Sequence, residues 1–336
     1  MLIYKANLQK TLRSLASSDA AASPYVAVQL DKEKEDPSFY RSSAFGFIQS
    51  KDFSPAKPAS YISLSHLYER IKILKEDQIE MDLDSNGILK ISSFGDTFSS
   101  EMRVHSVTSS QAGLKSHDVG EIALELDSNS LAGIDVSSFK LKIPPVMSSG
   151  RLLLATSDIV CIWDGSDVLK KAPTSPRESF LKSVANNSAV DQLVLTRNGY
   201  WGAATSDLLV FTYGHNVGKE MFAAYNVPSE KITEFPSERL MYCLRSLSEI
   251  VGEMEKITVI PKEGVTSKDR FGSEAKFSLG GTEGFTKFSM FGGTAKAIVS
   301  ALSQSQDEII VLSQVSMAHP TLRLRRGPFE VNFKVV

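Results

Sequence analysis

Apolar and polar residues alternate along two stretches of the chain, and each stretch carries an Asn-Gly pair at its centre. The first is Gln78–Ser93 around Asn86-Gly87, and the second is Asp191–Ser206 around Asn198-Gly199. Asn-Gly between alternating runs is a strong hairpin signal, because both central residues of a type I′ turn need a positive φ. The pattern therefore predicts two β-hairpins with type I′ turns.

The spacing of these hairpins indicates an internal repeat. A helix-like segment precedes each one, and the two turns lie 112 residues apart (198 − 86), which is one third of the 336-residue chain. A third copy is predicted to place a helix near residues 290–303 and a hairpin after it. The segments that fit are a helix from Thr294, a strand from Asp307, a turn around Met317–Pro320 and a strand from Thr321.

Each third also divides into two halves with the same order of helix and strands. One trace of this is Ala155-Thr-Ser-Asp, which recurs at Ala204. Six copies of a helix with antiparallel strands predict an α+β fold of three similar domains, each a duplicated half-module. We place the domains at residues 1–110, 111–230 and 231–336, with linkers near Thr108–Lys115 and Asn226–Pro236.

Composition narrows the class of protein. The chain is longer than one hydrophobic core usually supports, and its 42% apolar and 23% charged residues are ordinary for a soluble globular protein. Two cysteines exclude a disulfide framework or a cysteine-rich zinc site. No signal peptide and no membrane span are recognisable, so we expect a reducing cytoplasm and no membrane partner.

The usual signatures of catalysis and metal binding are missing. No histidine has a second histidine at helical spacing, and the Asp82–Ser93 segment lacks the glutamate that a calcium loop needs at its twelfth position. Cys161 and Cys243 are expected to be buried thiols. The one candidate for phosphate binding is the Gly292-Gly293 turn before a helix. We therefore expect no enzyme activity, metal or cofactor, and keep a nucleotide-binding enzyme that uses this turn as an alternative.

Positive charge is concentrated on the predicted helices. Most of them carry more lysine and arginine than acid, although the whole chain has a formal net charge of −2. Two explanations remain open. Amphipathic helices often carry cations on the face exposed to water, or these faces together form one surface that meets a polyanion.

At this point the sequence resembles the sliding clamps of replicative DNA polymerases, of the three-domain bacterial type. The likeness rests on three doubled α+β domains, on basic helices in an acidic chain, and on the order of elements from Thr286 to Val336. Ala155-Thr156 resembles the Ala-Thr that opens the clamps' protein-binding loop. The clamps' Asp-Gly-His-Arg after that threonine and their Met-Pro-Met-Arg-Leu terminus are absent, which indicates a divergent clamp of bacterial or bacteriophage origin.

The resemblance implies a ring-shaped head-to-tail homodimer that encircles double-stranded DNA without reading its sequence. It tethers a DNA polymerase and is opened by a clamp-loader ATPase. A virion or assembly protein of duplicated domains is a further alternative. The implied DNA-facing residues are Lys10, Arg13, Arg70, Lys72, Lys182, Arg239, Arg245 and Lys296. The implied partner-peptide pocket consists of Thr156, Ile159, Val160, Phe333, Val335 and Val336.

Overall fold

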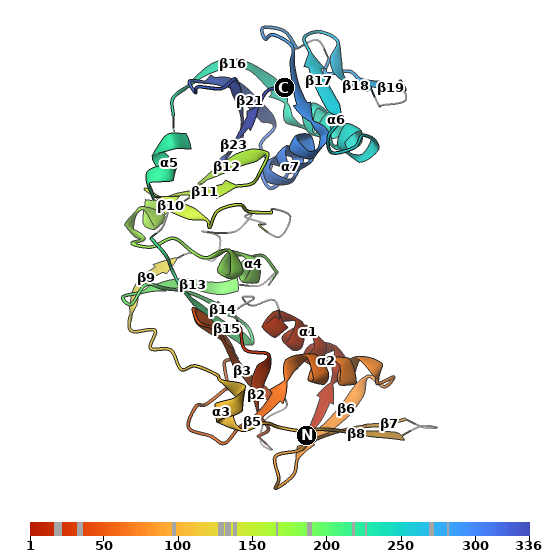
Figure 1. Ribbon diagram of the computed structural model, residues 1–336, viewed down its shortest axis with the longest axis vertical. Coiled ribbons are helices and arrows are strands. Elements are labelled where there is room, and N and C mark those ends of the chain that lie inside the picture. Colours follow the sequence, from red (N-terminus) through yellow and green to blue (C-terminus); the bar gives the residue numbers. More distant parts are fainter. Residues whose placement is uncertain are drawn as a thin grey trace. The chain divides into compact units, whose positions relative to one another are not determined.

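Two compact units make up the chain. The computed structural model describes residues 1–16, 22–31, 36–95, 99–126, 131, 136, 140–165, 167–186, 190–216, 219–225, 227–268, 272–280 and 282–336. Unit 1 comprises Met1–Ser128 and Ser179–Gly214, and unit 2 comprises Asn129–Glu178 and His215–Val336. Each unit contains one large and one four-stranded antiparallel sheet (Figure 1).

In unit 1 the large sheet has eight strands in the order β5-β2-β3-β4-β15-β14-β13-β9, and the small sheet has the order β1-β6-β7-β8. Their bounds are β1 (Leu2–Tyr4), β2 (Tyr25–Gln29), β3 (Ser38–Ser42), β4 (Gly46–Ser50), β5 (Ser60–Ser63), β6 (Gln78–Leu83), β7 (Leu89–Phe94), β8 (Ser99–Val104), β9 (Ile122–Leu126), β13 (Val190–Thr196), β14 (Tyr200–Thr205) and β15 (Leu208–Tyr213). The helices are α1 (Lys5–Ala16), α2 (Leu64–Ile73), α3 (Ser109–Ala112) and α4 (Glu178–Asn186).

In unit 2 the large sheet has seven strands in the order β10-β11-β12-β23-β22-β21-β16, and the small sheet has the order β19-β18-β17-β20. Their bounds are β10 (Val146–Ser148), β11 (Arg151–Ala155), β12 (Ile159–Asp164), β16 (Ser229–Pro236), β17 (Lys256–Ile260), β18 (Gly264–Lys268), β19 (Glu274–Phe277), β20 (Phe288–Phe291), β21 (Ile309–Val315), β22 (Thr321–Arg326) and β23 (Phe329–Lys334). The helices are the 3₁₀ turn η2 (Asp167–Lys171), α5 (Lys219–Tyr225), α6 (Ser237–Ile250) and α7 (Gly292–Leu302).

The predicted doubling is visible in the order and pairing of these elements. The half-module, one strand, one helix and three strands, occurs twice in the first third as β1-α1-β2-β3-β4 and β5-α2-β6-β7-β8. It occurs twice again in the last third, and in both thirds the opening strand of each half pairs with the other half. This confirms the α+β class, and it shows the doubled half-module in the first and last thirds of the chain.

The middle third contributes strands to both large sheets. Its β9 and β13–β15 lie in the sheet of unit 1, whereas its β10–β12 lie in the sheet of unit 2. The compact units therefore follow the sheets and cut through the middle third, so domain boundaries near residues 110 and 230 stay a prediction. The half-module repeat predicts a short helix over residues 130–138, and this segment falls outside the described residues apart from 131 and 136.

The predicted turn type is wrong. Gly87 and Gly199 have φ of 76° and 83°, but Asn86 and Asn198 are not in the left-handed region that type I′ requires of both residues. In the first turn the Asp84 carboxylate instead accepts the amides of Asn86 and Ile88 at 2.8 and 2.9 Å. These hydrogen bonds hold a longer loop closed with only the glycine at positive φ, and the one from Ile88 contributes most to lowering the pKa of Asp84.

The linker predicted at Asn226–Pro236 is also wrong over most of its length. Residues Ser229–Pro236 form β16, an edge strand that pairs with β21. Its side chains are largely exposed and polar, so the apolar alternation that reveals a half-buried strand is absent. Here the backbone pairing, rather than the side-chain pattern, makes the strand.

A buried arginine of the large sheet in unit 2 binds the residues at the start of β16. Arg323 on β22 is only 7% exposed, and its Nε donates to Asn332 Oδ1 at 2.7 Å. Its Nη atoms donate to the Val227 carbonyl at 3.1 Å and to Ser229 Oγ at 3.3 Å, and it pairs with buried Glu330 at 3.4 Å. Burial lowers the pKa of Arg323, so the charge depends on these partners.

Replacing Arg323 with methionine is expected to lower the free energy of unfolding by about 3 kcal/mol, because the buried carbonyls and Glu330 lose a charged donor. Urea unfolding measures the change. The matched control is Arg103→Met, which breaks the exposed pair with Glu101 and is expected to cost less than about 1 kcal/mol. Equal losses in both variants would contradict a structural role for the buried charge.

Candidate nucleic-acid interface and partner-peptide pocket

Four of the predicted cations lie on the paired helices α1 and α2 of unit 1, which Figure 1 shows side by side. The buried residues of both helices are leucines and one isoleucine, so the cations occupy the remaining faces. The exposed residues are Lys10 and Arg13 on α1 and Arg70 and Lys72 on α2. Arg13 Nε donates to the hydroxyl oxygen of Tyr68 at 3.0 Å and so links the two helices.

Lys10 has acidic neighbours. It lines a cleft of about 370 Å³ together with three exposed aspartates, Asp36, Asp52 and Asp207. Carboxylates in this position repel phosphate, so the local field opposes the predicted contact between Lys10 and DNA. Among the predicted cations of unit 1, Lys10 is therefore the weakest candidate.

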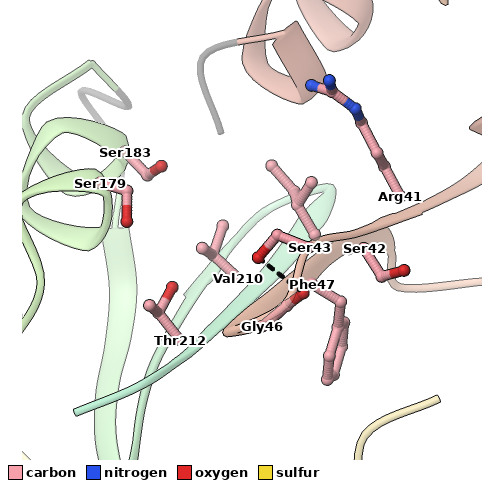
Figure 2. Close-up of a pocket in the computed structure, with 10 residues that line it drawn as sticks. Arg41, Ser42, Ser43, Gly46, Phe47, Ser179, Ser183, Val210 and Thr212 are labelled. Carbon is pink, nitrogen blue, oxygen red and sulfur yellow. Dashed lines mark hydrogen bonds between the residues drawn. The ribbon is translucent and has the colours of Figure 1, made fainter. Parts of the chain in front are cut away.

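Lys182 lies half-buried on α4, beside a small cleft that the helix forms with β3, β4 and β15. Figure 2 shows Ser179 and Ser183 of α4 on one side of this cleft, and Arg41 reaching away from it. The Arg41 guanidinium donates to the Leu15 carbonyl at 2.5 Å, near the end of α1, and burial lowers its pKa. With about 20 Å³ of free space, the cleft has room for about one water molecule and not for a larger ligand.

One of the three predicted cations of unit 2, Arg245, occupies a position equivalent to a predicted cation of unit 1. One constant offset along the chain carries Leu8, Leu12 and Leu15 of α1 onto the buried Leu240, Leu244 and Leu247 of α6. The same offset carries Arg13 onto exposed Arg245. A second offset relates the buried residues of α2 to those of α7 and carries Tyr68 onto exposed Lys296. The paired helices of both units thus present a polar pair at the same place.

Arg239 is held against a loop of its own unit. A Cβ atom added at Gly280, whose φ is +74°, would lie 1.8 Å from Arg239 Nη1, so the guanidinium rests directly on this glycine. Tyr242 on the same helix is 63% exposed and meets Phe277 edge-on at 5.9 Å between ring centroids. Sequence reasoning overlooked Tyr68 and Tyr242; a tyrosine among charges on the polar helix face was the available signal.

Thr156 closes the tight hairpin between β11 and β12. Its Oγ1 accepts the amides of Asp158 and Ile159 at 3.2 and 3.1 Å. The Ala204 repeat forms the same turn in unit 1, where Thr205 Oγ1 accepts the amides of Asp207 and Leu208 at 3.4 and 3.0 Å. The Ala-Thr-Ser-Asp motif is thus a repeated turn, and a role in partner binding requires more than its presence.

Two of the predicted pocket residues, Ile159 and Phe333, lie together in the core, whereas Val160 packs against a separate core cluster of unit 2. Ile159 pairs with Phe333 across β12 and β23, and each is 2% exposed. The Phe333 ring packs on Phe288 with centroids 6.0 Å apart. Of the tail, Val335 is half-buried and Val336 is 45% exposed, with the Val336 amide bound to the Ser289 carbonyl. The apolar tail expected to be open therefore reduces to its last two residues.

An open cleft with both polar and apolar lining lies over neighbouring strands of the same sheet. Its volume is about 420 Å³, and its apolar lining comes from Ile232, Phe285, Phe288, Leu312 and Leu322. Leu322 pairs with Phe333, and Phe288 packs on it, so the cleft adjoins the predicted residues without being lined by them. The partner-peptide pocket at Thr156, Ile159, Val160, Phe333, Val335 and Val336 stays a prediction.

The Gly292-Gly293 turn is unsuited to phosphate. Its two amides donate to the carbonyls of Glu255 and Glu253 at 2.9 and 3.0 Å, and a Cβ at Gly292 would lie 2.5 Å from the Gly252 carbonyl oxygen. The donors that a phosphate needs are already used, and two glutamates stand beside them. The glycines instead let α7 start close to the end of α6.

The described thiols and acids form neither an ionised cysteine nor a cluster of metal ligands. Burial raises the pKa of Cys161 to about 12 and also raises that of Cys243, so both remain neutral thiols. Within the described ranges, no three histidine, cysteine, aspartate or glutamate side chains gather as metal ligands. None of the described helices is long and apolar enough to cross a membrane.

Known structures with the same architecture match this chain over its full length. The sliding clamp of Bacillus subtilis is 13% identical, with a TM-score of 0.68, and is covered to 98%. The β clamp of Helicobacter pylori, solved with a DNA ligase peptide, is 12% identical with a TM-score of 0.68, and 99% of it is covered. The DNA polymerase III β subunit of Pseudomonas aeruginosa is 11% identical with a TM-score of 0.69, and 99% of it is covered. All of this chain is matched in each case.

This chain has the fold of a bacterial sliding clamp. The resemblance drawn from the sequence is thereby confirmed for the fold, across the whole length of the chain. No protein-family model matches it, and no curated protein matches it by sequence. The clamp fold therefore occurs here in a sequence with only 11–13% identity to these clamps.

The repeated turn yields a test of what Thr156 does. Thr156→Val and Thr205→Val each remove one oxygen that accepts two amides, and each is expected to destabilise its hairpin by about 1 kcal/mol. Hydrogen exchange of the β11–β12 and β14–β15 peptides should therefore quicken about fivefold in the matching variant alone. Unchanged exchange in Thr156→Val, with quickened exchange in Thr205→Val, would contradict the equivalence of the two turns.

Proposed function

We propose that the protein is a sliding clamp, a non-enzymatic ring that encircles double-stranded DNA and tethers a DNA polymerase to it. The observation that carries this proposal is the clamp fold over the entire chain, including the doubled half-modules. Together they account for the exposed cations on paired helices in a chain of net negative charge. Retention on DNA is then topological, and loose phosphate contacts allow sliding without reading bases.

The pairing of the half-modules indicates how the ring closes. Six half-modules have six last strands, and four of these pair within the chain, as β4 with β15 and β12 with β23. The two that remain are β8 and β19, each at the edge of a four-stranded sheet. The same contact between two copies leaves neither edge open and gives a head-to-tail homodimer of twelve half-modules.

Partners follow from the same proposal. A closed ring needs an ATP-driven loader to open it, because the chain carries no ATPase motif of its own. The cleft beside Phe333 has a size suited to anchoring side chains of a short peptide from a polymerase or loader. The similar Helicobacter clamp was solved with a DNA ligase peptide, which supports peptide docking here. Such a protein works in the cytoplasm of a bacterial cell, whether encoded by the cell or by a virus.

Closure can be tested on the free edge of β19. Neighbouring residues of a strand direct their amides to opposite sides. Of the two variants Ala275→Pro and Lys276→Pro, one therefore removes a donor to β18 and the other removes an outward donor. The variant that tests closure is the one that keeps the pairing with β18. That variant is expected to dissociate at least about tenfold more readily than the wild type in sedimentation equilibrium. A dimer equally stable in both variants would show that β19 does not close the ring.

Topological binding is tested on a nicked circular plasmid. Protein that has assembled around the circle from dilute solution should stay bound through gel filtration at high salt, since sliding offers no exit. One restriction cut should then release it within minutes. Retention that is the same on circular and linear DNA would contradict the encircling ring.

The helix cations are tested in the same assay. The variant Arg70→Glu/Lys72→Glu/Arg245→Glu/Lys296→Glu is expected to reduce loading about tenfold or more, because it reverses four charges at the phosphate surface. The matched control is Lys57→Glu/Lys115→Glu/Arg197→Glu/Lys262→Glu, which reverses four exposed cations outside the helices and should load almost normally. A similar loss in both would indicate a general charge effect.

A deletion that tests the tail has to spare Phe333, because Phe333 is part of the core. Removing Val335 and Val336 is expected to weaken polymerase-peptide binding about tenfold while the dimer forms normally. Leu322→Ala in the adjoining cleft serves as the second probe, and binding is read by fluorescence anisotropy. Normal binding in both variants would place the docking site elsewhere.

A further inference from the structure

Arg13 and Tyr68 form a contact between α1 and α2 that a simple row of surface charges would lack. The Arg13 side chain is exposed and the Tyr68 side chain is half-buried, and Arg13 Nε lies 3.0 Å from the Tyr68 hydroxyl oxygen. A guanidinium has five N–H groups, so four on the Nη atoms remain for a ligand once Nε is engaged. The tyrosine hydroxyl also keeps its own hydrogen for donation.

This contact restricts a side chain that otherwise has much freedom. An exposed arginine loses rotamer entropy when it binds a phosphate, and a hydrogen bond made beforehand reduces that loss. Tyr68 is suited to this task because its side chain is half-buried on α2, which limits the freedom of the ring. It supplies an acceptor to Nε without adding a carboxylate that would repel DNA.

The equivalent place in unit 2 supports a role at the same surface. There the offsets described above place Arg245 opposite Lys296, so a cation stands where unit 1 has Tyr68. The first helix keeps an arginine in both units, whereas its partner differs in charge. Tyr68 carries no charge to offer a phosphate, and its hydroxyl contacts the arginine beside it.

We propose that Tyr68 is a positioning residue for Arg13. It holds the guanidinium at Nε so that the two Nη groups project from the α1–α2 surface toward the phosphates of duplex DNA. This inference rests on the proposed function, and it concerns affinity for the backbone rather than the closing of the ring.

A double-mutant cycle in the full-length protein tests the coupling. The probe is a fluorescein-labelled 30-base-pair duplex, and its affinity is measured by anisotropy between 50 and 200 mM salt. Arg13→Ala is expected to weaken binding about tenfold and to lower the slope of log affinity against log salt by about one. Tyr68→Phe should weaken binding about threefold with an unchanged slope, because no charge is lost. Tyr68→Phe added to Arg13→Ala should have no further effect.

Tyr4→Phe, an exposed tyrosine on β1, is the matched control and should bind like the wild type. Thermal unfolding midpoints of all variants should agree, which separates positioning from folding. Additive losses in the double variant, or no loss in Tyr68→Phe, would overturn the inference while leaving the clamp function intact. A wild-type protein with no salt-dependent affinity for the duplex would overturn the inference alone, because the proposed clamp function requires retention on circular DNA and not affinity for a duplex with free ends.

Discussion

Backbone hydrogen bonding between the last strands of the half-modules is the interaction on which the rest of the structure depends. A three-stranded half-module ends in an open edge, and an open edge is a liability unless another strand covers it. Pairing β4 with β15 joins strands of the first and middle thirds in one large sheet, and pairing β12 with β23 joins strands of the middle and last thirds in the other. The helices pack on these sheets, so the sheets determine where the cations of the helices lie.

Side-chain chemistry around that frame differs between the units although the pairing pattern is shared. The connection after the first third is fastened by aromatic and imidazole groups, with the His117 ring between the Ser43 carbonyl and the Tyr200 hydroxyl at 3.1 and 3.2 Å. Burial contributes most to lowering the pKa of His117, which favours the neutral ring there. In unit 2 the same task falls to buried Arg323. Backbone pairing conserves the fold while such solutions diverge, which is consistent with full coverage at 10–13% identity.

Local patterns predicted the local features well. Alternation located the hairpins, and three- and four-residue spacing located the helices whose leucines are buried. The turn type failed because a carboxylate from Asp84, two residues before Asn86, competes for the amides that a type I′ turn would leave free. Strand β16 was missed because an exposed edge strand needs no apolar alternation.

The site was harder to predict, because its contacts join distant parts of the chain. The eight cations could be chosen by helix face. However, Lys10 shares a cleft with Asp207, and Arg239 packs on Gly280, only in the folded unit. Burial of Phe333 likewise depends on Phe288 and Ile159, which no pattern near the tail reveals. The contact of Tyr68 with Arg13 depends on the pairing of α1 with α2, which the sequence pattern does not reveal.

Single-particle imaging of the purified protein is the measurement that tests the account most directly. The free edges β8 and β19 predict closed rings of two copies, with a hole wide enough for duplex DNA and the helices facing inward. Class averages that show such rings would support the clamp. Open filaments, or compact particles with no hole at concentrations where the protein is dimeric, would contradict it.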